Sequence, residues 1–335
     1  MPDSPVLLIG GHGVTGRAVV RVLKSMHPDL ALLIGGRDLE KAAACAQEFG
    51  ATATRVDLSL PGLCLGEERP SAVIVLAKDA GLHAMEWARR LKIPYISLSS
   101  AAFEHSVDVT HALTGCLSAP VVIAGHWHAG AVMAATIDLA SHFDSLDSVV
   151  AGIMIDRTDV GGGPASIADF ERVARSSPTT LARIDGAYIW QSENESIGVY
   201  RGASGDSLQG KGAVSLDVVS IGAGTGAQNV RVLETWGTSH SFTSTGAAAD
   251  EVSIEIKGRI QNRQMVGWRV LTLPRHVGSL TALSIALLLE RVLGIGGDAP
   301  TPPGLYTPEL LIPPKSWVLR LPEFGVQVNT SFTQS

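Results

Sequence analysis

The chain has 335 residues, of which 45% are hydrophobic and 17% charged, and its mean hydropathy is +0.23. These proportions exclude an intrinsically disordered chain and are sufficient for two domains, each with a buried core. The formal net charge of −6 argues against nucleic acid as the main partner. The most apolar segment, residues 282–289, is followed by Glu290 and Arg291 and is too short to span a bilayer, so we expect no membrane partner.

The first predicted elements enclose a glycine-rich turn. An apolar run at residues 6–9 predicts a strand, and an apolar segment at 18–24 predicts a helix. Gly11 permits the sharp turn between them, Gly13 lets the backbone approach a pyrophosphate, and Gly16 allows the helix to pack closely on the strand. Amides at the start of the helix would bind the negative charge, although a glycine turn without a ligand is an alternative. The turn residues that we expect to bind a dinucleotide are Gly10, Gly11, Gly13, Val14, Thr15 and Gly16.

A second buried strand is predicted at residues 30–34, and Gly36 and Arg37 follow it. An NAD-specific protein places an acidic residue here, about twenty residues beyond the glycine turn, to bind the ribose hydroxyls. A small residue leaves room for a 2′-phosphate, and Arg37 supplies a planar cation to bind it, which favours NADP over NAD. Alternatively, Arg37 is a solvated loop charge. Asp38 is either the N-cap of a helix over 39–49 or a ribose ligand that would weaken the preference for NADP.

Four more strands are predicted at residues 52–56, 72–77, 95–98 and 120–124. Because helical segments alternate with them, we expect a Rossmann-type, doubly wound parallel sheet in an NADP-binding domain at residues 1–147. Asp57 follows the third strand, either near the adenine or as a turn residue. The fourth strand ends at Ala77 and delivers Lys78 and Asp79 to the carboxyl edge of the sheet, where ligands of open α/β folds bind.

The pattern changes after the helix predicted at residues 131–142. Hairpin-like strands with few helices predict a second α+β domain, built on a mostly antiparallel sheet, at residues 148–274. A glycine run at 161–163 and a helix at 167–175 lie within this domain. Its strands are predicted at residues 149–155, 212–221, 229–236, 252–260 and 265–273.

Residues 275–335 are predicted to return the chain to the nucleotide domain. They contain an apolar helix at 280–293 and a proline-rich connector at 300–314.

In this layout the chain resembles the saccharopine dehydrogenase-like NAD(P)-dependent reductases. The resemblance rests on the glycine turn, on the segment GGGPAS at 161–166 and on the segment PGLYTPE at 303–309. It implies a homodimer formed through the antiparallel sheet, and hydride exchange between a nicotinamide cofactor and a carbon–nitrogen bond. The chain departs from the family at Lys78, where a proline is common, and at His126-Trp127-His128, where a proline-glycine turn is common. The usual substrate of the family therefore does not transfer to this chain.

Four residues are candidates for the reacting centre: Lys78, His126, His128 and Tyr306. Lys78 could protonate a substrate nitrogen or anchor a carboxylate, or else pair with Asp79 or contact the cofactor ribose. The two histidines carry imidazoles that titrate near neutral pH, and we expect one of them to line the pocket. They lie on one side of the chain if the segment is extended and on different sides if it is helical. No third ligand accompanies them, so we predict no metal site. Tyr306 could supply a phenol, or serve in packing or in a turn.

The absence of several known motifs argues against other classes of enzyme. None of the four tyrosines precedes a lysine by four residues, which argues against the dyad of short-chain dehydrogenases, and no G-x-S-x-G elbow or Walker lysine occurs. Three isolated cysteines, and an N-terminus without a signal-like segment, favour a reducing, cytoplasmic location. We therefore predict an NADPH-dependent oxidoreductase that reduces the C=N bond of a small imine, cyclic or amino-acid-derived. A non-catalytic NADP-binding regulatory or assembly protein, and a carbonyl reductase, are the alternatives.

Overall fold

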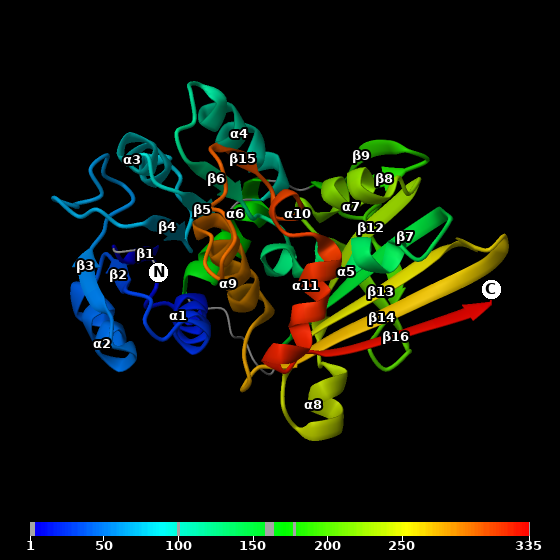
Figure 1. Ribbon diagram of the computed structural model, residues 1–335. Helices are drawn as coiled ribbons and strands as arrows, with labels where there is room; N and C mark the ends of the chain where they lie inside the picture. Colours follow the sequence, from blue (N-terminus) through cyan, green and yellow to red (C-terminus); the bar gives the residue numbers. More distant parts are fainter. Residues whose placement is uncertain (1–3, 99–100, 158–163, 177–178, 335) are drawn as a thin grey trace. The chain divides into compact units, whose positions relative to one another are not determined.

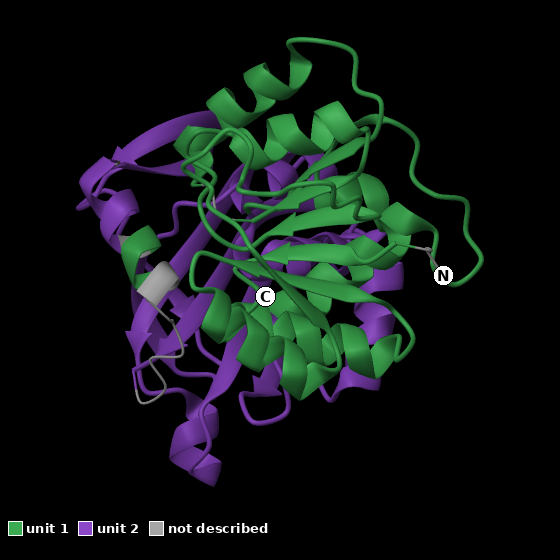
Figure 2. Cartoon of the chain, turned by 90° about the vertical axis from the view of Figure 1, so that its left-hand side faces the viewer, with its two compact units in different colours: residues 1–125, 162–170, 281–312 green, residues 126–161, 171–280, 313–335 purple. Residues whose placement is uncertain are grey.

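The structure is a computed structural model that describes residues 4–98, 101–157, 164–176 and 179–334. The glycine run at 161–163, on which part of the family resemblance rests, lies outside the described residues. The chain forms two compact units, which are coloured separately in Figure 2. Unit 1 comprises residues 1–125, 162–170 and 281–312, and unit 2 comprises residues 126–161, 171–280 and 313–335.

Unit 1 contains a seven-stranded sheet in the order β15-β6-β5-β4-β1-β2-β3, and all its strand pairs are parallel. Helices of the same unit cover both faces of this sheet (Figure 2). The doubly wound parallel sheet predicted from the sequence is therefore confirmed. Its strands are β1 (Val6–Ile9), β2 (Leu32–Gly36), β3 (Thr52–Arg55), β4 (Ala72–Val75), β5 (Tyr95–Ser97), β6 (Pro120–Ile123) and β15 (Gly304–Tyr306).

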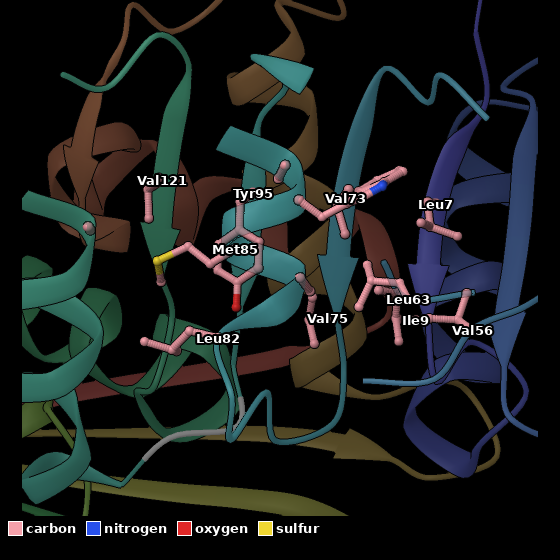
Figure 3. Close-up of a cluster of buried hydrophobic side chains, with 14 of the residues drawn as sticks. Leu7, Ile9, Val56, Leu63, Val73, Val75, Leu82, Met85, Tyr95 and Val121 are labelled. Carbon is pink, nitrogen blue, oxygen red and sulfur yellow. The ribbon is translucent and has the colours of Figure 1, made fainter. Parts of the chain in front are cut away.

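The core of unit 1 explains why its strands are continuous apolar runs. A parallel strand with helices on both faces has no side open to water, so its side chains are apolar without alternation. Leu7 of β1, Val73 of β4 and Tyr95 of β5 join Met85 in one buried cluster (Figure 3). The helices of unit 1 are α1 (Val14–Met26), α2 (Leu39–Phe49), α3 (His83–Leu91), η1 (Ala102–Glu104), α4 (His105–Leu113), α10 (Pro308–Leu311) and, apart from its first residue, α9 (Leu280–Leu293).

Unit 2 contains a nine-stranded sheet whose main path runs β10-β11-β12-β7-β13-β14-β16, while β8 pairs with both β12 and β9. Only the β12–β7 pair is parallel among these described strands, so the prediction of a mostly antiparallel second sheet is confirmed. The strands are β7 (Ser145–Asp156), β8 (Thr179–Ile184), β9 (Ala187–Ser192), β10 (Gly198–Arg201), β11 (Ser207–Gly212), β12 (Asn229–Gly237), β13 (Ala249–Ile260), β14 (Arg263–Pro274) and β16 (Gln327–Gln334).

A buried helix, α5, organises the helical part of unit 2. Nearly all of its side chains are buried, and it contacts α7 and α11 (Figure 1). Arg269 of β14 fixes α5 to the sheet, because its Nη1 lies 2.7 Å from Oδ2 of Asp138. The helices of this unit are η2 (Trp127–Gly130), α5 (Ala131–Ala140), α7 (Asp217–Thr225), α8 (His240–Thr245), α11 (Pro314–Arg320) and η3 (Leu321–Phe324), and α6 (Pro164–Ser176) continues into it from unit 1.

The strands predicted for the second sheet differ from the structure in two ways. The strand predicted at 212–221 is wrong, because β11 ends at Gly212 and the apolar residues that follow form α7. Val218 and Ile221 are buried at helical spacing, and Gly226, with a φ of 70°, ends the helix. The hairpin β8–β9, the strand β10 and the terminal strand β16 are absent from the prediction, although Asp185 and Gly186, both with positive φ, form a typical hairpin turn.

Within the described ranges, no helix combines the length and the apolar character needed to cross a membrane.

Candidate functional site

The glycine turn after β1 places each glycine for a distinct reason. Gly10 adopts a φ of 83°, a left-handed conformation that glycine accepts without strain. The sequence assigned the sharp turn to Gly11, but this requirement falls on Gly10. A Cβ at Gly16 would overlap the backbone of both Gly10 and Gly11, so only glycine allows α1 to approach the turn this closely. Ala77 lies beside Gly10, since its Cβ is 4.0 Å from where a Cβ of Gly10 would stand.

The N-terminus of α1 forms the open end of this turn. The helix begins at Val14, earlier than the start predicted at residue 18, with Gly13 as its N-cap. The first amides of a helix, here including Val14, Thr15 and Gly16, have no carbonyl partner within the helix. The first turn of α1 contains no acidic residue, and Val14 is 52% exposed. This end of the helix can therefore accept an anionic group such as a pyrophosphate.

The end of β2 carries the predicted adenosine-binding residues. Gly36 is buried and Arg37 is exposed. Asp38 accepts a hydrogen bond from the backbone N–H of Lys41 at 3.1 Å and pairs with Lys41 Nζ at 3.0 Å. The N-cap role for Asp38 is therefore confirmed. The histidine of the glycine turn, His12, packs against Gly36. Sequence reasoning missed His12, because nothing local to the turn shows which strand its side chain meets.

Asp57 follows β3 and serves in a turn. Its Oδ1 accepts hydrogen bonds from the backbone N–H of Ser59 at 3.0 Å and from the Ser59 hydroxyl at 2.7 Å. These two bonds are the main cause of a lowered pKa of the Asp57 carboxyl, with smaller contributions from Arg37 and Arg55. Asp57 thus takes the turn role that the sequence left open.

Lys78 lies after β4 in a cluster of buried charges. Its Nζ is 3.5 Å from Oε2 of Glu104 and 3.9 Å from Oδ1 of Asp108. Nδ1 of His105 in turn lies 3.5 Å from the other oxygen of Asp108. All four side chains are at most 17% exposed, so the two ion pairs of Lys78 are poorly screened by solvent. The arrangement holds an ammonium group at the carboxyl edge of the sheet, where ligands of this fold class bind.

Asp79 does not serve as the main partner of Lys78; it caps α3. Its Oδ2 accepts hydrogen bonds from the backbone N–H groups of Ala84 at 3.0 Å and Met85 at 3.1 Å, and Tyr95 donates from 3.4 Å. Burial raises the pKa of Asp79, and the backbone hydrogen bonds oppose that effect. The carboxyl group therefore has a structural role in closing α3 against β5.

The two candidate histidines belong to unit 2 and differ in their surroundings. His126 is 6% exposed, and its Nε2 lies 2.9 Å from Oγ of Ser220. The next residue, Trp127, donates its backbone N–H to Oδ2 of Asp217 at 2.8 Å. Burial raises the pKa of Asp217, while the nearby His126 lowers it. These bonds hold the start of the histidine segment against α7.

His128 occupies a strained part of the same segment. His128 and Ala129 have φ values of 50° and 51°, and Gly130 follows at 109°. Left-handed backbone at non-glycine residues is costly and tends to occur at functional sites. Burial lowers the pKa of His128; the charge of Asp250 opposes this effect and that of Arg275 reinforces it. Asp250 and Arg275 are themselves paired, with Arg275 Nε 2.7 Å from Oδ1 of Asp250.

Tyr306 ends β15, at the edge of the sheet of unit 1. Its hydroxyl donates to the carbonyl of Pro302 at 3.0 Å, which gives the phenol a role in closing the turn before the strand. Among the described residues, no cluster of three or more histidine, cysteine, aspartate or glutamate side chains is arranged to hold a metal ion.

No protein-family model matches the sequence, and no curated protein matches it. Among solved structures, saccharopine dehydrogenase (L-Glu forming) from Saccharomyces cerevisiae, in its apo form, matches with a TM-score of 0.67 and 13% identity, over 99% of this chain and 100% of that one. A myo-inositol dehydrogenase from Lactobacillus casei, in complex with NAD(H) and myo-inositol, matches with a TM-score of 0.49 and 12% identity, over 99% of this chain and 97% of that one. The first of these similarities shows that the chain has the fold of saccharopine dehydrogenase, so the resemblance predicted from the sequence is confirmed for the fold.

Proposed function

We propose, on the premise of that fold, that the chain is an NADPH-dependent oxidoreductase that reduces the C=N bond of a small imine, cyclic or derived from an amino acid. The observation that carries the proposal is the glycine turn. Gly10 has the left-handed conformation, and Gly16 stands where any side chain would overlap the turn. These two features leave the N-terminus of α1 open to a pyrophosphate, as a dinucleotide-binding site requires.

The preference for NADP is supported by the end of β2. Gly36 offers no carboxylate for the ribose hydroxyls, and Asp38 is engaged as the N-cap of α2. Arg37 is exposed beside it and can bind a 2′-phosphate. The rest of the cofactor would be held by Gly10, Gly11, Gly13, Val14, Thr15, Gly16 and Ala77. Asp57 would contribute indirectly, through its electrostatic interaction with Arg37.

Each unit, taken by itself, contains one residue that we propose for the chemistry: Lys78 in unit 1 and His128 in unit 2. When bound, the cofactor supplies the hydride. Lys78 would hold a proton at Nζ for the substrate nitrogen, and Glu104 would orient that ammonium group. His126 is hydrogen-bonded to Ser220 and positions the segment, which leaves the pocket-lining role to His128. Tyr306 is assigned to the turn that it closes.

We also propose roles for the two predicted domains, a homodimer and a cytoplasmic location for the protein. Residues 1–147 would bind the cofactor, and residues 148–274 would bind substrate and form a homodimer. Cys45, Cys64 and Cys116 are free, which is consistent with a reducing, cytoplasmic compartment. Sedimentation of the purified protein tests the dimer, and a monomer at all concentrations would contradict it.

The activity is tested by following NADPH oxidation with a panel of cyclic imines and of keto acid–amine pairs. We expect turnover with at least one imine, and loss of turnover in Lys78→Met and His128→Ala with NADPH binding retained in calorimetry. Turnover with ketones alone would favour a carbonyl reductase. Tight NADPH binding without turnover on any compound would favour a regulatory protein, and a folded protein that binds no nicotinamide coenzyme would refute the proposal.

A further inference from the structure

His12, in the middle of the glycine turn, lies against the end of β2. A Cβ added to Gly36 would overlap Cε1 of the His12 imidazole and lie 2.5 Å from its Nδ1, whereas Nε2 would be 3.5 Å away. The edge of the ring that carries Nδ1 therefore faces the Gly36 backbone. His12 and Gly36, which are far apart in the sequence, are thus in contact at the proposed nucleotide site.

This contact places the imidazole in the position used by the ribose-binding acid of NAD-specific proteins. That acid stands at the end of the second strand, which in this chain is Gly36. The imidazole of His12 occupies the space that the side chain of an aspartate or glutamate at Gly36 would enter, so one of the two side chains would have to move. The glycine at position 36 therefore leaves room for the imidazole in this place.

Nδ1 of His12 is buried and has no hydrogen-bond partner among the described residues. Burial lowers the pKa of His12, while Asp38 raises it and Lys41 lowers it. A buried polar atom without a partner is costly, and the cost disappears when the imidazole turns away from Gly36 and a ligand oxygen supplies the missing bond. Arg37, the residue after Gly36, is exposed next to this position.

We propose that His12 is a specificity-determining residue, which binds the 2′-phosphate of NADP(H) through its imidazole together with Arg37 and excludes the acid that would select NAD(H). The inference rests on the proposed function, because it assumes that the turn binds a nicotinamide dinucleotide. It adds a residue of the turn to the pair Gly36 and Arg37 suggested by the sequence.

The test uses two nucleotides that differ only in the 2′-phosphate: adenosine 2′,5′-bisphosphate and adenosine 5′-monophosphate. Their dissociation constants are measured by calorimetry on the full chain, so no turnover is needed. In His12→Ala we expect the preference for the bisphosphate to fall by about tenfold, as for the loss of one charge-assisted hydrogen bond, with little change for the monophosphate. His12→Asn keeps an N–H donor near the place of Nδ1 and should retain most of the preference. His240→Ala, which removes an exposed histidine of unit 2, is the matched control.

A second pair of variants tests the mutual exclusion of His12 and an acid. Gly36→Asp alone should bind neither nucleotide well, since the new side chain meets the imidazole. His12→Gly combined with Gly36→Asp should recover binding of the monophosphate, and should prefer it to the bisphosphate. The double variant would then bind the monophosphate better than the sum of the two single changes predicts. Such non-additivity of binding free energies is expected only for two residues that compete for one space.

The outcomes separate the inference from the proposed function. If the wild-type protein binds neither nucleotide and no NADPH, the proposed function fails. If it binds both, but His12→Ala keeps the full preference or weakens both nucleotides equally, the function stands and the role of His12 is refuted. Circular dichroism and thermal unfolding identify any variant that has lost its fold. If His12→Ala is unfolded, the preference of His12→Asn for the bisphosphate decides whether His12 has the proposed role.

Discussion

The ammonium group of Lys78 lies 3.5 Å from Oε2 of Glu104, at the carboxyl edge of the parallel sheet, and both side chains are nearly buried. Glu104 is itself fixed, because the same oxygen accepts a hydrogen bond from the backbone N–H of Ala101 at 2.9 Å. A lysine held in this way keeps one position, which a proton donor to a bound substrate requires.

Replacing Lys78 by methionine should separate binding from chemistry. Methionine keeps the length of the side chain and removes the proton, so we expect kcat to fall by about a hundredfold or more while the Kd for NADPH changes little. Stopped-flow kinetics and calorimetry measure the two quantities. Lys315→Met, at an exposed position of α11, is the control and should leave both unchanged. Equal loss of binding and turnover in Lys78→Met would show instead that the lysine holds the cofactor.

Gly16→Ala should abolish nucleotide binding. The added Cβ would overlap the carbonyl oxygen of Gly10 and the Cα of Gly11, which are backbone atoms, so no change of rotamer can relieve the contact. We expect the Kd for NADPH to rise by more than about tenfold and the free energy of unfolding to fall by about 2 kcal/mol. In Gly62→Ala the new methyl group has no described heavy atom within 4 Å, so this variant should behave as wild type. Unchanged NADPH affinity in Gly16→Ala would contradict the assigned role of the turn.

Gly152→Ala should destabilise unit 2 without changing cofactor affinity. Gly152 of β7 lies beneath the ring of Tyr200, and a Cβ there would overlap the aromatic carbons. We expect urea denaturation to show a loss of about 1 to 3 kcal/mol, the usual cost of overpacking a core. Adding Tyr200→Leu should recover part of it, because the two side chains share the same space. Gly237→Ala is the control, since its Cβ would make an ordinary contact of 3.7 Å with Met154.

Glu234 should make the stability of unit 2 depend on pH. Burial raises its pKa from 4.5 to about 7, although Lys211, 3.9 Å away, opposes the shift. Between these two values the folded chain holds a proton that the unfolded chain has released, so the folded state loses stability as the pH rises through this range. The loss is about 3 kcal/mol at most. Glu234→Gln should abolish it.

Urea denaturation at about pH 5 and about pH 8 measures this effect, and wild type should be destabilised relative to Glu234→Gln at the higher pH. Lys211→Met removes the opposing cation and should enlarge the difference. A stability that does not change between these two values in wild type, or one that rises equally in wild type and Glu234→Gln, would refute the assignment to Glu234.

The amino-acid sequence by itself determined the features that depend on neighbouring residues. Apolar runs that alternate with helical segments predicted the parallel sheet of unit 1, and the glycine spacing predicted the turn before α1. Asp38 could be recognised as an N-cap because a cap and its helix are adjacent. These features follow from local backbone preferences and from side-chain periodicity, which act within about ten residues.

The tertiary structure alone decided which distant residues meet. Most of the segment predicted as a strand at 212–221 belongs to α7 in the folded chain, because burial against α5 favours a helix there over the β pattern of its apolar residues. The tertiary structure also paired Lys78 with Glu104, His126 with Ser220 and His12 with Gly36. Such pairs follow from strand order and helix packing, which bring together segments that share no local pattern, and so their chemistry becomes visible only in the folded chain.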